Sequence, residues 1–152
     1  MVFDMTKDEI IQKLADLNAV IDKQPRDTAE FHEASTEMSR LTFGTIGMRE
    51  VAFIVDALGR PLTNPELADL IIASEAHRPL NSVISLPAEA DAAYTIKYRR
   101  KQAGMTQVDL AKKIGIEQSQ LAKIENGQLR VGLNLLQRAM TVFGTSYIVK
   151  AL

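Results

Sequence analysis

The chain of 152 residues contains no cysteine and no tryptophan, and it has only two histidines. The absence of cysteine excludes disulfides, thiolate zinc sites and a thiol nucleophile. His32 and His77 lie far apart in the sequence, which fits surface or helix-end positions better than a shared metal. We therefore predict no metal site and no cofactor. A chain without cysteine also suits a reducing compartment, and we expect a cytoplasmic protein.

Long apolar runs are missing as well, although hydrophobic residues make up 46% of the chain. That fraction is enough for a packed core, but no run approaches the length of a membrane span. The first residues lack the pattern of a secretory signal, so we expect none. Glycine-rich phosphate loops are absent too, and the scattered carboxylates resemble a solvated helix face. We predict that the protein is not an enzyme.

The net charge of −1 conceals two halves of opposite sign. Residues 1–90 contain 15 Asp and Glu against 8 Lys and Arg, whereas residues 91–152 contain 4 against 10. A basic half is what binding to phosphates requires, because neutralising phosphates releases counterions. The acidic half would repel nucleic acid and is better suited to another partner. The charges alone predict two functional regions.

Apolar spacing predicts a mainly helical, all-α fold with two regions and a connector. An acidic helical region for partner binding or dimerisation is expected over residues 1–78, with helices at about 6–21, 27–41, 48–58 and 63–76. Asp27 is the expected cap of the second helix, and Thr63 with Glu66 suggests a capping box. Residues 79–91 read as a linker containing a short strand at 82–86. A C-terminal domain follows over residues 92–152.

The stripe of the first predicted helix allows two interpretations. Ile10, Leu14, Leu17 and Ile21 recur at spacings of four and three, as they do in a helix with one buried face. The first two helices can pack inside the chain, or they can form a coiled pair between two chains, because small four-helix units often associate. The residues alone leave both open.

The clearest motif is the stretch Thr106–Gly127, which predicts two short helices joined by a tight turn. Thr106 and Asp109 form a candidate capping box, and Gly115 follows the last apolar residue of the first helix. The second helix is expected at about 117–124 and ends at Asn126-Gly127. This is the layout of a helix-turn-helix that reads DNA in the major groove.

The outward residues of the second helix suit base edges. A glutamine amide offers a donor and an acceptor that match adenine N6 and N7, and serine can contact any base. Lysine and arginine suit guanine edges or phosphates. The candidates on this face are Gln118, Ser119, Gln120 and Lys123, with Arg130 in the following loop.

Residues 96–144 resemble an XRE-type domain, the helix-turn-helix family of phage Cro and repressor proteins. The segment Ile96-Lys-Tyr-Arg-Arg-Lys-Gln-Ala-Gly-Met-Thr-Gln is similar to the family's first helix, and Ser119 through Gly127 to its recognition helix and exit turn. The resemblance implies a λ-repressor-like fold over about one third of the chain. It also implies DNA contacts at Gln107, base contacts at Gln118, Ser119 and Lys123, and phosphate contacts at Asn126 and Arg130.

The resemblance also assigns a structural role to one charged pair. Arg100 and Glu125 occupy positions that form an ion pair in some family members. We therefore expect Arg100 to brace Glu125 rather than to contact DNA.

The last residues, from Ser146 to Leu152, are β-branched and aromatic, which is typical of a strand. They resemble XRE-type antitoxins that end in a short strand paired across a dimer. Pairing with a second chain, or with the short strand expected at 82–86, would satisfy the open edge of such a strand. We expect a homodimer.

Taken together, the sequence predicts a sequence-specific regulator that binds double-stranded DNA and represses transcription at a palindromic operator. The acidic half leaves two interpretations open. The protein is an antitoxin that neutralises a toxin and represses its own operon, or a phage-type or metabolic regulator with an N-terminal sensor or dimerisation region. A protein that uses the helix-turn-helix only for interaction is the remaining alternative.

Overall fold

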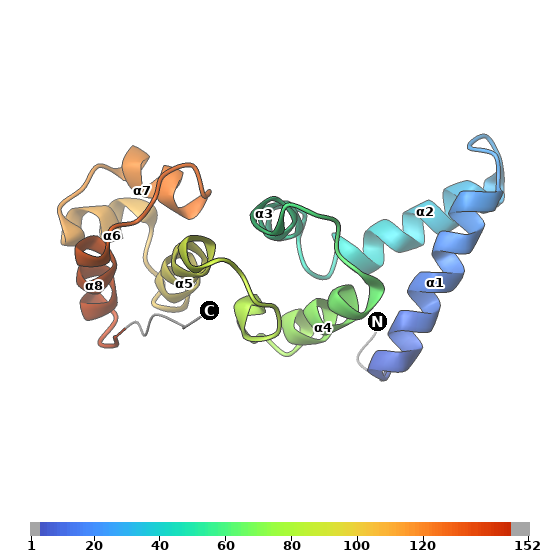
Figure 1. Cartoon of the computed structure of the whole chain (residues 1–152), viewed down its shortest axis with the longest axis horizontal. Helices are drawn as coiled ribbons and strands as arrows, with labels where there is room; N and C mark the ends of the chain where they lie inside the picture. The colour runs from blue at the N-terminus through green and yellow to red at the C-terminus, as the bar shows by residue number, and fades with distance from the viewer. Residues whose placement is uncertain (1–3, 147–152) are drawn as a thin grey trace. The chain divides into compact units, whose positions relative to one another are not determined.

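The computed structural model describes residues 4–146, and every regular element in that range is helical. The expected all-α class with a C-terminal helix-turn-helix is thus confirmed. The chain divides into two compact units with the boundary between residues 84 and 85 (Figure 1). The strand predicted for the C-terminal tail falls mostly on residues 147–152, which lie outside the described range.

Residues 4–84, the described part of the first unit, contain four α-helices and one 3-10 helix. They are α1 (Lys7–Lys23), α2 (Ala29–Thr42), α3 (Met48–Leu58), α4 (Asn64–Glu75) and η1 (Leu80–Ser82). In Figure 1, α1 and α2 form an antiparallel hairpin. α1 packs against both α2 and α4.

Capping side chains fix where these helices begin. Thr6 and Glu9 form a reciprocal capping box at the start of α1, which satisfies two backbone N–H groups that the helix itself leaves unpaired. The cap of α2 corrects an expectation. Thr28, not Asp27, accepts a hydrogen bond from the N–H of Phe31. Thr28 has the extended backbone that an N-cap needs, and its hydroxyl also donates to the carbonyl of Pro25.

The apolar stripe of α1 is buried at its N-terminal end. Ile10 and Leu14 are completely inaccessible to solvent. α4 runs antiparallel along this part of α1: Lys7 Nζ lies 2.9 Å from an Asp69 carboxylate oxygen, and Asn18 donates to the Asn64 side chain at 3.5 Å. Leu17 and Ile21 continue the stripe but are only half-buried. Over at least the first two turns of α1, the stripe therefore forms part of the hydrophobic core of this chain.

The segment predicted as a linker, residues 79–91, holds regular structure at both of its ends. η1 lies near its start, and the helix α5 (Ala88–Gln102) begins before its end. The strand expected at 82–86 is wrong: these residues form the end of η1, a turn and an irregular stretch. Ser82 turns back to the Pro79 carbonyl, so the local hydrogen bonds of this segment form a turn instead of a sheet ladder.

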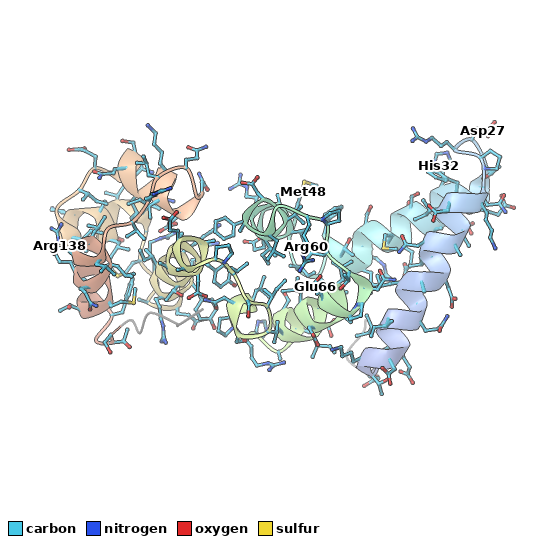
Figure 2. All side chains as sticks on the ribbon, in the orientation of Figure 1. Asp27, His32, Met48, Arg60, Glu66 and Arg138 are labelled. Atoms are coloured by element: carbon cyan, nitrogen blue, oxygen red, sulfur yellow. The ribbon has the colours of Figure 1, made fainter. Side chains whose placement is uncertain are left out.

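At the start of α4, Thr63 and Glu66 form the predicted capping box, which is confirmed. Glu66 also receives two hydrogen bonds of 2.8 Å from the guanidinium of Arg60, and both residues are labelled in Figure 2. Arg60, together with the Thr63 backbone N–H, lowers the pKa of the Glu66 carboxyl from 4.5 to about 2.

We predict that Glu66→Gln lowers the free energy of unfolding at neutral pH by up to about 1 kcal/mol, since glutamine keeps the box but not the charge and the pair is partly exposed. The folded pKa lies below the unfolded one. The contribution of Glu66 is therefore complete above about pH 4.5 and is lost as the pH falls towards 2. Urea unfolding of both proteins between pH 7 and pH 2.5 should show their difference shrinking across that window. Asp56→Asn, at an exposed position of α3, is the matched control.

Candidate DNA interface

In its described residues, up to 146, the second unit contains four helices packed around one apolar core. They are α5 (Ala88–Gln102), α6 (Gln107–Ile114), α7 (Gln118–Glu125) and α8 (Leu133–Val142). α6 packs against α7 and α8, and α5 also packs against both of these helices. The core contains the residues that the helix-turn-helix pattern placed inward, among them Leu110, Ala111, Ile114, Leu121 and Ile124.

Both ends of α6 have the local features that the sequence predicted. Thr106 and Asp109 form a capping box at the start of α6, and the Thr106 N–H lowers the pKa of the Asp109 carboxyl. Gly115 ends α6 in the left-handed region at φ 75°, where a side chain would be strained. Arg138, labelled on α8 in Figure 2, donates to the last carbonyl of α6, that of Ile114, at 2.7 Å. This hydrogen bond connects the C-terminal end of α6 to α8.

A buried ion pair joins α5 to α7. Arg100 Nε and Nη2 each donate to one carboxylate oxygen of Glu125 at 2.8 Å. The two side chains are 9% and 1% exposed. The third nitrogen, Arg100 Nη1, donates to the carbonyl of Met105 in the connection between α5 and α6. Arg100 therefore braces the fold from inside and does not present its charge to solvent.

From this pair, a chain of hydrogen bonds leads to the surface. Gln107 Nε2, in the first turn of α6, donates to Glu125 Oε1 at 3.1 Å. Gln118 Nε2, in the first turn of α7, donates to Gln107 Oε1 at 2.8 Å. Gln107 is half-buried and Gln118 is exposed. The N-termini of α6 and α7 are thus connected through two amides to a charge in the core.

The outward side of α7 carries the other predicted contact residues. Ser119, Gln120 and Lys123 are exposed, whereas Leu121, Ile124 and Glu125 on the opposite side are buried. α7 begins one residue later than expected because Glu117 is its N-cap. The structure brings Gln107, Gln118 and the exposed face of α7 into one polar surface.

The two residues predicted to contact phosphates lie after α7. Asn126 is the C-cap of α7 and is exposed. Gly127 follows at φ 76°, which lets the chain turn so that the N–H groups of Gln128 and Leu129 both donate to the Lys123 carbonyl. Arg130 is 86% exposed and has a partner that sequence reasoning missed: Glu89 on α5, whose carboxylate oxygen lies 3.4 Å from Arg130 Nε. No sequence signal links the two, because they are separated by the whole of α6 and α7.

The part of the chain that the structure describes contains neither a candidate metal site nor a candidate membrane-spanning helix. Among residues 4–146, no group of three His, Asp or Glu side chains is placed to hold a metal ion. No helix in that range is both long and apolar enough to cross a membrane.

Residues 96–148, about one third of the chain, match the protein family described as Helix-turn-helix. Comparisons with curated proteins and with solved structures gave no match. The matched segment begins inside α5 and includes α6, α7 and α8, so the family and the geometry identify the same unit. This unit is an XRE-type helix-turn-helix domain. The protein is accordingly of the kind that binds DNA as a transcriptional regulator.

Truncating one member of the buried pair should be costly, because the other charge is then left unpaired in the core. We predict that Arg100→Ala lowers the free energy of unfolding of the C-terminal unit by about 3–5 kcal/mol. Thermal unfolding followed by circular dichroism should show a large fall in melting temperature. The double variant Arg100→Met with Glu125→Leu should lose less stability than either of these two substitutions alone. A loss equal to the sum of the two single losses would contradict an interaction between the two side chains.

Proposed function

We propose that the protein reads a specific DNA sequence through α7 and represses transcription by occupying an operator. The observation that carries this proposal is the hydrogen-bonded chain from Arg100 through Glu125 and Gln107 to Gln118. It supports the proposal because it holds an exposed amide at the start of α7 in one orientation. A fixed amide recognises a base at a smaller loss of side-chain entropy than a mobile one.

The donors and acceptors of the two amides support specific roles. Gln118 Nε2 uses one of its two hydrogens on Gln107, which leaves the other hydrogen and the carbonyl oxygen for a base. One donor beside one acceptor is the pattern that matches adenine N7 and N6. Gln107 Nε2 likewise keeps one hydrogen after its bond to Glu125, which suits a phosphate oxygen. Ser119, Gln120 and Lys123 extend the reading surface along α7, and Asn126 adds a second polar contact for the backbone.

A single short helix gives limited specificity, since each good base contact supplies only about 1–3 kcal/mol. A two-fold dimer doubles the contacts and requires a palindromic site whose halves lie about one helical turn apart. We therefore include a homodimer in the proposal.

The acidic first unit favours one further candidate. Residues 1–84 carry 14 Asp and Glu against 8 Lys and Arg. A surface with this excess suits a basic protein partner, as it would in an antitoxin whose toxin is cationic. A sensor or dimerisation unit of another regulator is the alternative. Glu30 and Glu33 are two exposed carboxylates on α2. A basic protein that is encoded beside this chain and copurifies with it would favour the antitoxin if the double variant Glu30→Gln with Glu33→Gln no longer retains it.

The full-length protein should select a palindromic sequence from a pool of random duplexes. Binding measured at several salt concentrations then separates base contacts from phosphate contacts, because only phosphate contacts change the slope with salt. Uniform binding to every duplex with no enriched motif would contradict sequence-specific reading.

We predict that Gln118→Ala relaxes the preference at one base position of each half-site by about 1–3 kcal/mol and leaves the other positions unchanged. Repeating the selection with this variant gives the measurement. Gln107→Ala should weaken the same preference, since it removes the partner that orients Gln118. Gln137→Ala, at an exposed site on α8, is the control and should select the same motif as the original protein. A loss of affinity by Gln118→Ala that is equal at all positions would speak against base reading by Gln118.

A further inference from the structure

Three carboxylates in the described part of the second unit serve the fold. Asp109 belongs to the capping box of α6, Glu125 forms the buried pair, and Asp91 is buried near the start of α5. Glu89 is different, because its side chain is 61% exposed and its Oε1 lies 3.4 Å from the Nε of Arg130. This carboxylate thus contacts a cation that the sequence assigned to a DNA phosphate.

The chain segments that carry Glu89 and Arg130 are both held by the core of the unit. Ala92, which lies one turn after Glu89 on α5, is part of the core cluster. Val131, the residue after Arg130, packs against the same cluster. The two segments cannot move apart without disturbing that core. The contact can therefore re-form each time that it opens, although a single exposed pair contributes little to stability.

Glu89 lies outside the segment that matches the helix-turn-helix family. The match covers residues 96–148, whereas α5 begins at Ala88, so about two turns of α5 precede it. Arg130 lies inside the matched segment. The family match therefore accounts for the loop that carries the cation, but it does not account for the carboxylate beside it.

We propose that Glu89 masks Arg130 from DNA phosphates and thereby acts as an autoinhibitory residue of the DNA interface. An N–H of the guanidinium that donates to a carboxylate is not available to a phosphate oxygen, so a phosphate has to displace Glu89. This competition lowers the affinity for every duplex alike, because phosphate contacts carry no sequence information. The masking rests on the proposed function, in which the loop after α7 faces the DNA backbone.

The consequence of masking is weaker binding to non-specific DNA. Phosphate contacts supply essentially all of the affinity for non-specific sites, whereas an operator also offers base contacts to α7. A masked cation therefore shortens the time that the protein spends on other sequences. The base contacts still hold the protein on its operator.

Glu89 has a second role at the start of α5, which the test has to separate from masking. It lies in the first turn of the helix, where a negative charge interacts favourably with the helix dipole. A role limited to the helix end predicts that loss of the charge lowers stability and brings no gain in DNA binding. Masking predicts that DNA binding becomes tighter.

Binding of the full chain to a fluorescein-labelled duplex of arbitrary sequence, measured by anisotropy at several salt concentrations, tests the masking. We expect Glu89→Gln to bind about two- to fivefold more tightly at low salt, since the pair is exposed. The slope of log K against log salt should steepen by up to about one unit, because one more phosphate is neutralised. Asp56→Asn makes the same change in net charge at an exposed position of the first unit and should bind as the original chain does.

A double-mutant cycle shows whether Glu89 acts through Arg130. Arg130→Ala alone should weaken binding to all duplexes. Adding Glu89→Gln to Arg130→Ala should bring no gain, because no guanidinium remains to be unmasked. An equal gain with and without Arg130 would show that Glu89 repels phosphates in general, and it would overturn the masking.

The possible results separate the masking from the proposed function. Binding that Glu89→Gln leaves unchanged, with or without a lower melting temperature, overturns the masking alone. The expected gain in a chain that selects no sequence supports the masking and refutes specific reading. A chain that binds no duplex at any salt concentration overturns both.

Discussion

The ion pair between Arg100 and Glu125 is the constraint on which the C-terminal unit depends. Removing two charges from water is costly, and the geometry must compensate that cost. Here it does so: all three guanidinium nitrogens have acceptors, in Glu125 and the Met105 carbonyl. Every buried side-chain nitrogen and oxygen in the described residues has a partner. Because Arg100 contacts α7 and the connection between α5 and α6 at once, a shift of α5 or α7 would separate the charges, and a shift of the connection would leave Arg100 Nη1 without its acceptor.

The same pair sets the position of the polar surface. Glu125 Oε1 accepts from both Arg100 and Gln107, so the order of the Gln107 amide depends on a residue that is almost fully buried. Gln118 then depends on Gln107. Under the proposed function, stability and recognition are thus connected through atoms that lie within hydrogen-bonding distance. If the proposed function holds, a variant of Glu125 should change both properties, whereas a variant of Gln118 at the exposed end of the chain of bonds should affect recognition alone.

The elements that the sequence predicted best are those whose signals are local. The capping boxes of Thr63 and Thr106 and the left-handed Gly115 need only neighbouring residues, and all are confirmed. The prediction of a strand at residues 82–86 was wrong. Two serines and β-branched residues give this segment a composition that resembles a strand, but hydrogen bonds within a local turn determine its conformation. The first turn of α5, residues 88–91, was read as linker, since its one buried residue is Asp91 and the helix shows little hydrophobic periodicity. The contacts of Gln107 with Glu125 and of Glu89 with Arg130 join distant positions, and one sequence carries no signal for them.

The division of charge has a consequence for how the two units affect binding to DNA. Ion pairs within the first unit occupy several of its cations, such as Lys7 with Asp69, Lys13 with Glu37 and Arg60 with Glu66. Its excess of carboxylates remains unbalanced, and near a duplex it repels phosphates over a distance of roughly 8 Å at physiological salt. The affinity of the full chain is therefore lower than that of the basic unit whenever the acidic unit comes within that distance. A cationic partner that neutralises the first unit would remove this repulsion, so partner binding and DNA binding would each strengthen the other by the same factor.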